Sequence, residues 1–330
     1  MKALTTTQYG GPEVVQISDV AKPTPAANDV LVRVHASAVN TGDWRIRAAA
    51  FPGVLAIAGR LMFGLRRPKN PRLGSEFAGT IEAIGSDVTR FQPGDAVFGL
   101  TLKGGASAEY MTIAEDEAVA AMPSALDFDE AAALPFGGVC ALVFLEQYAN
   151  VQPGQRVLVV GASGGVGTYG VQIAKALGAH VTGVASTDNL TFVKTLGADA
   201  VIDYRTTDLA TVSDRFDVIF DTVGAVSPRV ARRLSNKGGL FLPLNMGLRE
   251  VGASLLNVLR SKKIKLAVNG DSAEDLIQLS QMVEAGTIKP VIDTIYPLEN
   301  ARDAHAQVEG RHRRGAIILS VAAPLNRAAA

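Results

Sequence analysis

The chain has 330 residues, of which 48% are hydrophobic and 19% charged, a balance typical of folded globular domains rather than of disordered chains. At about 100–200 residues per domain, this length predicts two domains. Lys plus Arg (32) equals Asp plus Glu (32), so no overall field favours nucleic acid or an anionic membrane, and we expect a small-molecule partner.

Targeting and redox signals are few. The start of the chain, MKALTTTQYGG, lacks a long apolar stretch, and no later run is apolar enough to span a bilayer. The single cysteine, Cys140, cannot form an internal disulfide, which is compatible with a reducing compartment. We therefore expect a cytoplasmic protein that does not bind membranes.

Short strands separated by turns are predicted from residue 1 to about 125. Apolar or alternating stretches at 30–39, 79–85 and 95–100 indicate a mostly β unit. From about residue 126 the pattern changes to helices and strands in alternation. The run RVLVVGA (156–162) has the continuous apolar character of a strand buried on both faces of a parallel sheet.

Strand and helix units then repeat along the second half of the chain. Further strands are predicted at 180–186, 200–204, 216–224 and 238–245. Repeated units of this kind imply right-handed crossovers and a doubly wound parallel sheet, so the fold class is α/β. Periodicity alone does not assign the elements after about residue 270 to either domain.

A glycine-rich loop joins the strand RVLVV to the next helix. Glycines at such a junction allow a tight turn and close backbone approach to a pyrophosphate, which the helix N-terminus attracts. Compared with G-x-G-x-x-G, Ala162 replaces the first glycine whereas Gly164 and Gly167 match. An ordinary turn is the alternative, but the neighbouring strands favour a dinucleotide. The expected cofactor-binding residues are Gly161, Ala162, Ser163, Gly164, Gly165, Val166 and Gly167.

The end of the second strand favours NADP(H) over NAD(H). An NAD site usually has Asp or Glu about 20 residues after the loop, where it binds the ribose hydroxyls. Here Ser186 and Thr187 stand at that place, so no carboxylate repels a 2′-phosphate and two hydroxyls could donate to it. Asp188 and Asn189 follow where a phosphate site would ideally offer Lys or Arg, so NAD(H) stays an alternative.

Ordered matches over nearly the whole chain resemble the medium-chain dehydrogenase/reductase superfamily, in its zinc-independent quinone oxidoreductase-like branch. They include VLVRVHASAVNTGD, LGSEFAGTIEAIGSDVTRFQPGDAVFG, LPFGGVCAL, GASGGVGTYGVQIAKALGA and RRGAIILSV. The resemblance implies a GroES-like catalytic domain at 1–125, completed by about 270–330, and a Rossmann NAD(P)-binding domain at 126–269. It also implies an active site in the cleft between them and a homodimer paired through the Rossmann sheets.

No metal is expected. The resemblance places Asn40, Ser75 and, roughly, Phe136 where zinc-dependent relatives have Cys, His and Cys, and only Glu76 survives. Without a Lewis acid, oxidation of an unactivated alcohol loses the polarisation that zinc provides. Hydride transfer to an acceptor that is already electron-poor needs less help, which favours a quinone or an α,β-unsaturated carbonyl.

The catalytic candidates lie in NTGDWR (40–45), which the resemblance places beside the nicotinamide. Asn40 and Asp43 match the branch, whereas Arg45 stands where many quinone reductases carry tyrosine. Arg45 could stabilise an enolate or quinol oxygen as a permanent cation, and solvent would then supply the proton. The alternative is that Asp43 and Arg45 form a structural ion pair while Asn40 caps a turn.

Further residues are expected at the cofactor. Cys140 stands where relatives commonly have a threonine that contacts the cofactor, although a buried cysteine is usually an inert small hydrophobe. Tyr204 matches a tyrosine near the adenosine end, or is a plain aromatic at a strand end. Four residues end successive strands on the side where open α/β sheets bind ligands, and we expect them to contact the nicotinamide half. They are Val223, Gly224, Leu244 and Asn245.

These observations favour a metal-free, NADP(H)-dependent oxidoreductase that transfers hydride to a small electrophilic substrate, a quinone or an α,β-unsaturated carbonyl. A second hypothesis is reversible alcohol/carbonyl oxidoreduction, which the missing zinc ligands disfavour. A third is a nucleotide-binding regulatory or scaffold protein without turnover, for which the missing tyrosine at position 45 is the sequence support.

Overall fold

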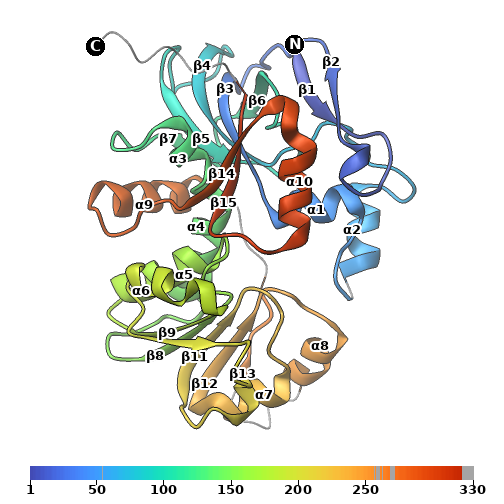
Figure 1. Ribbon diagram of the computed structural model, residues 1–330. Helices are drawn as coiled ribbons and strands as arrows, with labels where there is room; N and C mark the ends of the chain where they lie inside the picture. Colours follow the sequence, from blue (N-terminus) through green and yellow to red (C-terminus); the bar gives the residue numbers. More distant parts are fainter. Residues whose placement is uncertain (54, 256, 258–260, 262, 268–271, 322–330) are drawn as a thin grey trace.

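The computed structural model describes residues 1–53, 55–255, 257, 261, 263–267 and 272–321. A seven-stranded, mostly antiparallel sheet occupies the upper part of Figure 1, and a six-stranded parallel sheet the lower part. Helix α4 (Pro135–Leu142) lies between them, packed against α5 (Gly167–Ala176) and α9 (Ala273–Glu284). The mixed α/β architecture predicted from the sequence is confirmed.

The upper sheet has the order β14-β15-β3-β4-β5-β7, and β6 also pairs with β3. The strands predicted at 30–39, 79–85 and 95–100 are confirmed as β3, β4 and β5. The bounds are β3 Asp29–Val39, β4 Glu76–Ile84, β5 Ala96–Leu100, β6 Tyr110–Ala114, β7 Val119–Ala121, β14 Ile292–Pro297 and β15 Ala316–Ser320.

The late strands β14 and β15 complete the upper sheet. β15 is antiparallel to β3 with Ile317 opposite Val39, so the loop before β15 lies beside the start of α1 (Thr41–Ala48). Helix α3 (Phe128–Ala132) packs on β3 and β4, although it follows the predicted boundary at residue 125. The other predicted boundary, between residues 269 and 270, lies outside the described residues.

The lower sheet has the order β10-β9-β8-β11-β12-β13, and every neighbouring pair is parallel. It is the doubly wound sheet predicted from the sequence. The chain passes from β8 to β9 on one side and later returns to β11 on the other, which leaves a crevice beyond the carboxyl end of β8. The bounds are β8 Arg156–Val160, β9 His180–Ala185, β10 Ala200–Asp203, β11 Phe216–Asp221, β12 Ser235–Pro243 and β13 Lys263–Ile264.

The parallel sheet is covered on both faces, and the remaining elements are short. Val157, Leu158 and Val159 of β8 are fully buried, because helices cover both faces of a parallel sheet. No helix in the described part of the chain is long and apolar enough to cross a bilayer. The other elements are β1 Lys2–Thr5, β2 Gln16–Asp19, α2 Leu55–Phe63, a π-helical turn Val143–Tyr148, α6 Leu190–Thr195, α7 Pro228–Leu234, α8 Leu248–Ser254, α10 Ala301–Gly310, and 3-10 turns at Pro12–Val14, Thr187–Asn189, Leu209–Thr211 and Leu298–Asn300.

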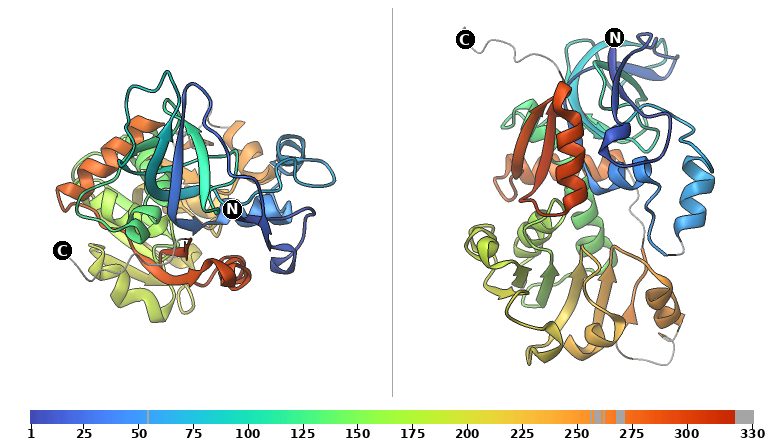
Figure 2. Two further views of the ribbon diagram at one scale, coloured as in Figure 1. Left: turned by 90° about the horizontal axis from the view of Figure 1, so that it is seen from above. Right: turned by 45° about the vertical axis from the view of Figure 1, so that its right-hand side comes forward.

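Helices α2 and α8 lie on the same side of the molecule, one from each part (Figure 2). The loops that precede them touch, since a Cβ atom on Gly53 would lie 2.8 Å from the Cα atom of Gly247. Gly53 has a φ of +52°, so glycine serves both the turn and the close approach at this contact.

Candidate active site

The glycine-rich loop turns sharply between β8 and α5. Gly161 has a φ of +79°, and a Cβ there would lie 2.6 Å from Cγ1 of Val223. A Cβ on Gly167 would lie 2.0 Å from the carbonyl oxygen of Gly161. Both positions therefore require glycine, for the turn and for the packing of helix on strand.

Gly164 has a different environment. The nearest atom to a Cβ at Gly164 would be the carbonyl oxygen of Gly161, 3.4 Å away, so the protein itself leaves this space open. Ser163 and Gly164 border a larger cavity, and Gly164, Gly165 and Val166 border a smaller one. Ala162 is instead fully buried, and its N–H donates to the carbonyl of Val184 at 3.0 Å. Open space before the N-terminus of α5 fits a diphosphate.

The two cavities adjoin at the crevice beyond β8. Their volumes are about 710 Å³ and about 90 Å³, and the larger one is of the size that small-molecule sites have. They share Gly164, Val223, Arg311 and Arg313. The larger cavity thus extends from the glycine loop toward β9 and β10, and the smaller one toward α1 and α4.

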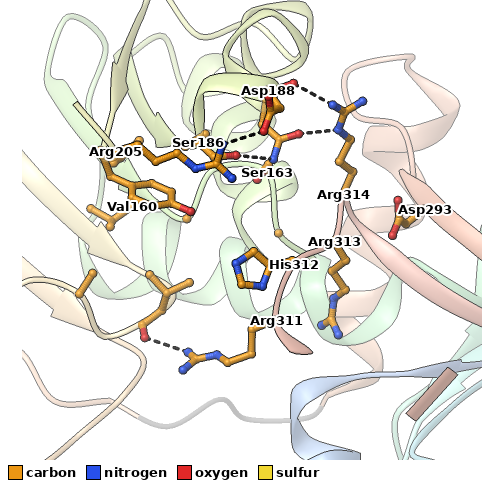
Figure 3. A pocket seen from close by; sticks show the side chains of 18 of the residues that line it. Val160, Ser163, Ser186, Asp188, Arg205, Asp293, Arg311, His312, Arg313 and Arg314 are labelled. Carbon is orange, nitrogen blue, oxygen red and sulfur yellow. Dashed lines mark hydrogen bonds and ion pairs between the residues drawn. The ribbon is translucent and has the colours of Figure 1, made fainter. Parts of the chain in front are cut away.

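Positive charge gathers on the larger cavity. Four arginines border it, against two aspartates, Asp188 and Asp293. Residues 311–314 enter from the loop between α10 and β15, opposite the ends of β9 and β10 (Figure 3). This excess of cations suits a ligand with several phosphates. The arginines are Arg205, Arg311, Arg313 and Arg314.

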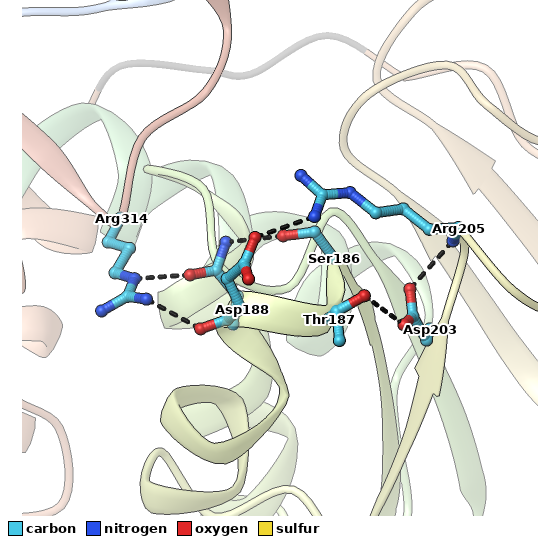
Figure 4. A network of polar contacts seen from close by, with 7 residues as sticks. Ser186, Thr187, Asp188, Asp203, Arg205 and Arg314 are labelled. Carbon is cyan, nitrogen blue, oxygen red and sulfur yellow. Dashed lines mark hydrogen bonds and ion pairs between the residues drawn. The ribbon is translucent and has the colours of Figure 1, made fainter.

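The end of β9 is held in a polar network (Figure 4). The Arg205 Nη1 atom donates to Oδ2 of Asp188 at 2.8 Å, and Nη2 of Arg314 donates to the carbonyl of Asp188 at 2.7 Å. The Oγ atom of Ser186 accepts from Nδ2 of Asn189 at 3.0 Å, so its own proton is available to another group. Arg205 therefore pairs with the Asp188 carboxylate, and Arg314 adds a second cation, at the place where sequence reasoning found no Lys or Arg.

Thr187 and Tyr204 differ in their relation to the cavity. The Thr187 hydroxyl donates to Oδ2 of Asp203 at 2.5 Å, and Thr187 does not border either cavity. Tyr204 follows β10, is half exposed and borders the larger cavity. Its ring stands where an adenine could stack, beside Arg205.

Asn40 and Asp43 form a capping box at the start of α1. The Oδ1 atom of Asn40 accepts from the N–H groups of Gly42 at 2.6 Å and Asp43 at 3.1 Å, while Oδ2 of Asp43 accepts from the Asn40 N–H at 2.9 Å. Asn40 also borders the smaller cavity, so one side chain both caps α1 and lines the candidate site. The capping alternative is confirmed for Asn40.

The ion-pair alternative for Asp43 and Arg45 is wrong. Arg45 instead donates to Oδ1 of Asn245, which follows β12, while Asp43 is committed to its cap. The Asp43 side chain is buried, and burial raises its pKa to about 6. Arg45 borders the smaller cavity, whereas Asp43 lies behind the wall.

Glu76 is a buried acid on the wall of the smaller cavity. Its Oε1 atom accepts from Nδ2 of Asn40 at 3.0 Å, and the same Nδ2 donates to Oγ of Ser75 at 2.8 Å. Burial, and then the charge of Asp43, raise the pKa of Glu76 to about 8. Glu76 is therefore mostly protonated at neutral pH.

This donor set does not fit zinc. The Oδ1 atom of Asn40 accepts from two backbone N–H groups, so its NH₂ group faces Ser75 and Glu76. Asn40 therefore presents N–H hydrogens on that side, and no lone pair that could bind a metal. Zinc sites in proteins use thiolate, imidazole or carboxylate ligands. In the described residues, no three His, Cys, Asp or Glu side chains converge on one point.

The remaining residues expected at the cofactor differ in their relation to the two cavities. Val223 borders both cavities. Cys140 is buried in α4, and neither Cys140 nor Gly224, Leu244 or Asn245 borders either of the two cavities. A Cβ on Gly224 would lie 2.8 Å from Nδ2 of Asn245, so these two residues pack on each other.

Asp221 holds the backbone at Val223, the residue that borders both cavities, and sequence reasoning missed this role. Its Oδ1 atom accepts from the N–H groups of Val223 at 3.1 Å and Gly224 at 2.8 Å, and Oδ2 accepts from Val226 at 2.8 Å. Arg205 and residues 311–314 were missed as well. For residues 311–314, the available signal was the basic run RHRR, one glycine before the strand AIILSV.

A parallel sheet of this strand order, with an open glycine loop at the point where the order reverses, defines a dinucleotide-binding protein. Comparison with known families identifies it further. Residues 26–124 match the alcohol dehydrogenase GroES-like domain, and residues 196–319 match the zinc-binding dehydrogenase family.

Three relatives illustrate the likeness. A chloroplast envelope quinone oxidoreductase homolog from Arabidopsis thaliana is 31% identical, over 97% of this chain and 98% of its own. The quinone oxidoreductase structure from Coxiella burnetii superposes with a TM-score of 0.86 at 29% identity, covering 98% of this chain and 99% of its own. That of Escherichia coli quinone oxidoreductase complexed with NADPH gives 0.83 at 26%, covering 97% and 100%.

The chain belongs to the medium-chain dehydrogenase/reductase superfamily, in its quinone oxidoreductase-like branch. It is accordingly an oxidoreductase that depends on a nicotinamide cofactor.

Proposed function

We propose that this protein is a metal-free, NADP(H)-dependent oxidoreductase that reduces a quinone or an α,β-unsaturated carbonyl. The observation that carries the proposal is the cationic end of the larger cavity. There Ser186 offers a free O–H group, Arg205 pairs with the carboxylate of Asp188, Arg314 adds a second cation, and no carboxylate ends β9. Such a site favours a 2′-phosphate over a ribose hydroxyl.

The rest of the cofactor would follow the two cavities. The open space at Gly164 and the N-terminus of α5 would hold the diphosphate, and the shared wall at Val223 would bring the nicotinamide to the smaller cavity. When bound, the reduced nicotinamide supplies a hydride. Arg45 borders the smaller cavity and offers a fixed positive charge to the acceptor bound there.

Alcohol oxidation is the weaker candidate, because the amide of Asn40 stands where that reaction needs a metal ligand. An electron-poor acceptor removes that requirement. A binding protein without turnover would bind NADPH but leave every acceptor unreduced.

The test is the initial rate of NADPH and NADH oxidation with a simple quinone and a simple enone, each with and without a metal chelator. We expect chelator-insensitive turnover that favours NADPH. Chelator-sensitive alcohol oxidation would support the second candidate. Tight NADPH binding with no turnover across quinones, enones and aldehydes would refute the proposal.

We also propose a cytoplasmic homodimer paired through the parallel sheets. β13 ends the strand order of the lower sheet, and an edge strand offers N–H and C=O groups to a second copy. The mass in solution, measured by light scattering, tests the pairing, and a monomer at micromolar concentration contradicts it. Fractionation of cells that express the protein tests the compartment.

A further inference from the structure

Two arginines from distant parts of the chain meet at the smaller cavity. Arg45 comes from α1, and Arg311 follows α10 with a φ of +59°, a left-handed conformation that is unusual for a residue other than glycine. Arg311 donates to the carbonyl of Val223 at 3.0 Å, and Arg45 donates to the side-chain carbonyl of Asn245. Both guanidinium groups therefore have neutral partners.

No carboxylate among the described residues lies within ion-pair distance of this pair. Within the part of the chain that the structure describes, the ion pairs shorter than 4.0 Å include neither arginine. Burial, and then the nearby charge of Arg311, lower the pKa of Arg45. Two partly buried cations without a nearby carboxylate raise the free energy of the folded protein, and a bound anion lowers it.

The other charged groups on this wall do not remove the excess. Arg313 adds a third guanidinium, which faces the buried acids Glu76 and Asp43 and the partly exposed Asp293 from beyond ion-pair distance. Glu76 has a raised pKa and is largely neutral at pH 7. The smaller cavity thus has a positive lining at neutral pH.

The cofactor accounts for part of this charge but not for Arg45. The diphosphate belongs at Gly164 and the start of α5, and the 2′-phosphate at Ser186, both on the larger cavity. Arg311 borders both cavities, whereas Arg45 borders only the smaller one. An anion that meets Arg45 must therefore arrive with the second substrate.

We infer, on the basis of the proposed function, that the acceptor carries a carboxylate, held by Arg45 with Arg311 beside it, next to an electron-poor double bond. The hydride of NADPH forms a new C–H bond at the β-carbon of the acceptor. The C=C π electrons pass to the carbonyl oxygen, and a proton from solvent then completes the α-carbon. NADPH is oxidised, the alkene is reduced, and the carboxylate keeps its charge.

A matched pair of acceptors tests this inference: trans-4-oxopent-2-enoate and its methyl ester. Each variant is compared with wild type on the same acceptor, so the different reactivities of acid and ester cancel. We expect Arg45→Met to lower kcat/KM for the acid by about 10- to 100-fold, the loss of a charge-assisted hydrogen bond, and that for the ester by less than about threefold. Arg45→Lys should recover much of the acid rate, and the Kd for NADPH should not change.

Two controls separate charge from structure. Asn245→Ala removes the partner of Arg45 but keeps its charge, so the acid-to-ester ratio should persist even if both rates fall. Arg229→Met removes one charge from an exposed position of α7 and should change neither rate. With NADPH at saturation, raised ionic strength should weaken the reaction of the acid more than that of the ester.

Binding gives a measurement that does not depend on turnover. The saturated acid, 4-oxopentanoate, should bind the wild-type complex with NADP⁺ in calorimetry and bind the Arg45→Met complex at least about 10-fold more weakly. Equal binding by both, or equal loss of acid and ester rates in Arg45→Met, would overturn the inference. Normal binding without reduction of any quinone or enone would refute the proposed function and leave the anion site standing.

Discussion

Ser186→Asp should shift the cofactor preference from NADPH toward NADH. Ser186 is buried, borders the larger cavity and keeps a free proton for an acceptor. Aspartate there would replace that donor with a negative charge; for an assumed separation of about 5 Å, its repulsion of a 2′-phosphate is about 2 to 3 kcal/mol at an effective dielectric constant of about 20 to 40. Because Arg205 and Arg314 offset part of it, we expect a net loss of about 2 kcal/mol, or about 30-fold in the NADPH to NADH ratio of kcat/KM.

The assay is the initial rate of oxidation of each cofactor at a fixed quinone concentration. Ser186→Ala is the matched control, since it removes the hydroxyl without adding charge and should cost NADPH at most about tenfold. NADH should change little in Ser186→Ala and improve in Ser186→Asp, whose carboxylate can accept from the ribose hydroxyls. An equal loss for both cofactors in Ser186→Asp would show that the 2′-phosphate does not lie at this residue.

Three further predictions concern the loop and two buried titratable groups. Gly167→Ala should lower Tm by about 5 °C and abolish NADPH binding, because its Cβ would overlap the Gly161 carbonyl. Gly164→Ala should keep the wild-type Tm and only weaken NADPH binding, because the space beside Gly164 is open. Thermal melts and NADPH fluorescence distinguish the two variants. Glu76 holds a proton up to a pKa of about 8 in the folded protein and loses it near 4.5 when unfolded, so it makes stability fall as pH rises between these values. Melts from pH 5 to 8 should show a flatter decline for Glu76→Gln, and an unchanged slope would contradict the raised pKa. Burial lowers the pKa of His305 to about 3 from 6.5, so the unfolded chain gains a proton first and stability falls as pH drops through this range. His305→Gln should lose less Tm than wild type between pH 7 and 4, and an equal loss would refute that assignment.

The parts of the site that depend on local backbone geometry could be predicted from the sequence. Gly161 and Gly167 serve a turn and a close contact within seven residues, and the flanking apolar runs identify strand and helix. Asn40 was likewise placed at a turn and at the site, because a capping side chain and the residue it caps are three positions apart.

The charged wall could not be predicted in this way. Arg205 and Arg314 meet Asp188 only because β10 lies beside β9 and because β15 pairs with β3 in one particular register. The β15–β3 pairing joins segments about as far apart as the chain allows, and alternation in a sequence does not determine the register of either pairing. For the same reason, Arg45 suggested an ion pair with Asp43, two residues away, but its partner is Asn245.

The place of residues 311–314 has a consequence for how the protein is made. The last strand of the parallel sheet ends at Ile264, yet the cationic wall of its cavity comes from Arg311 and Arg314, which the ribosome adds later. The nucleotide-binding sheet is therefore synthesised before its pocket has a complete wall. Since only a finished site lets a ligand stabilise a fold, the nicotinamide cofactor can protect the new chain only after β15 has joined β3, and cofactor retention in a cell would report completed synthesis of this protein.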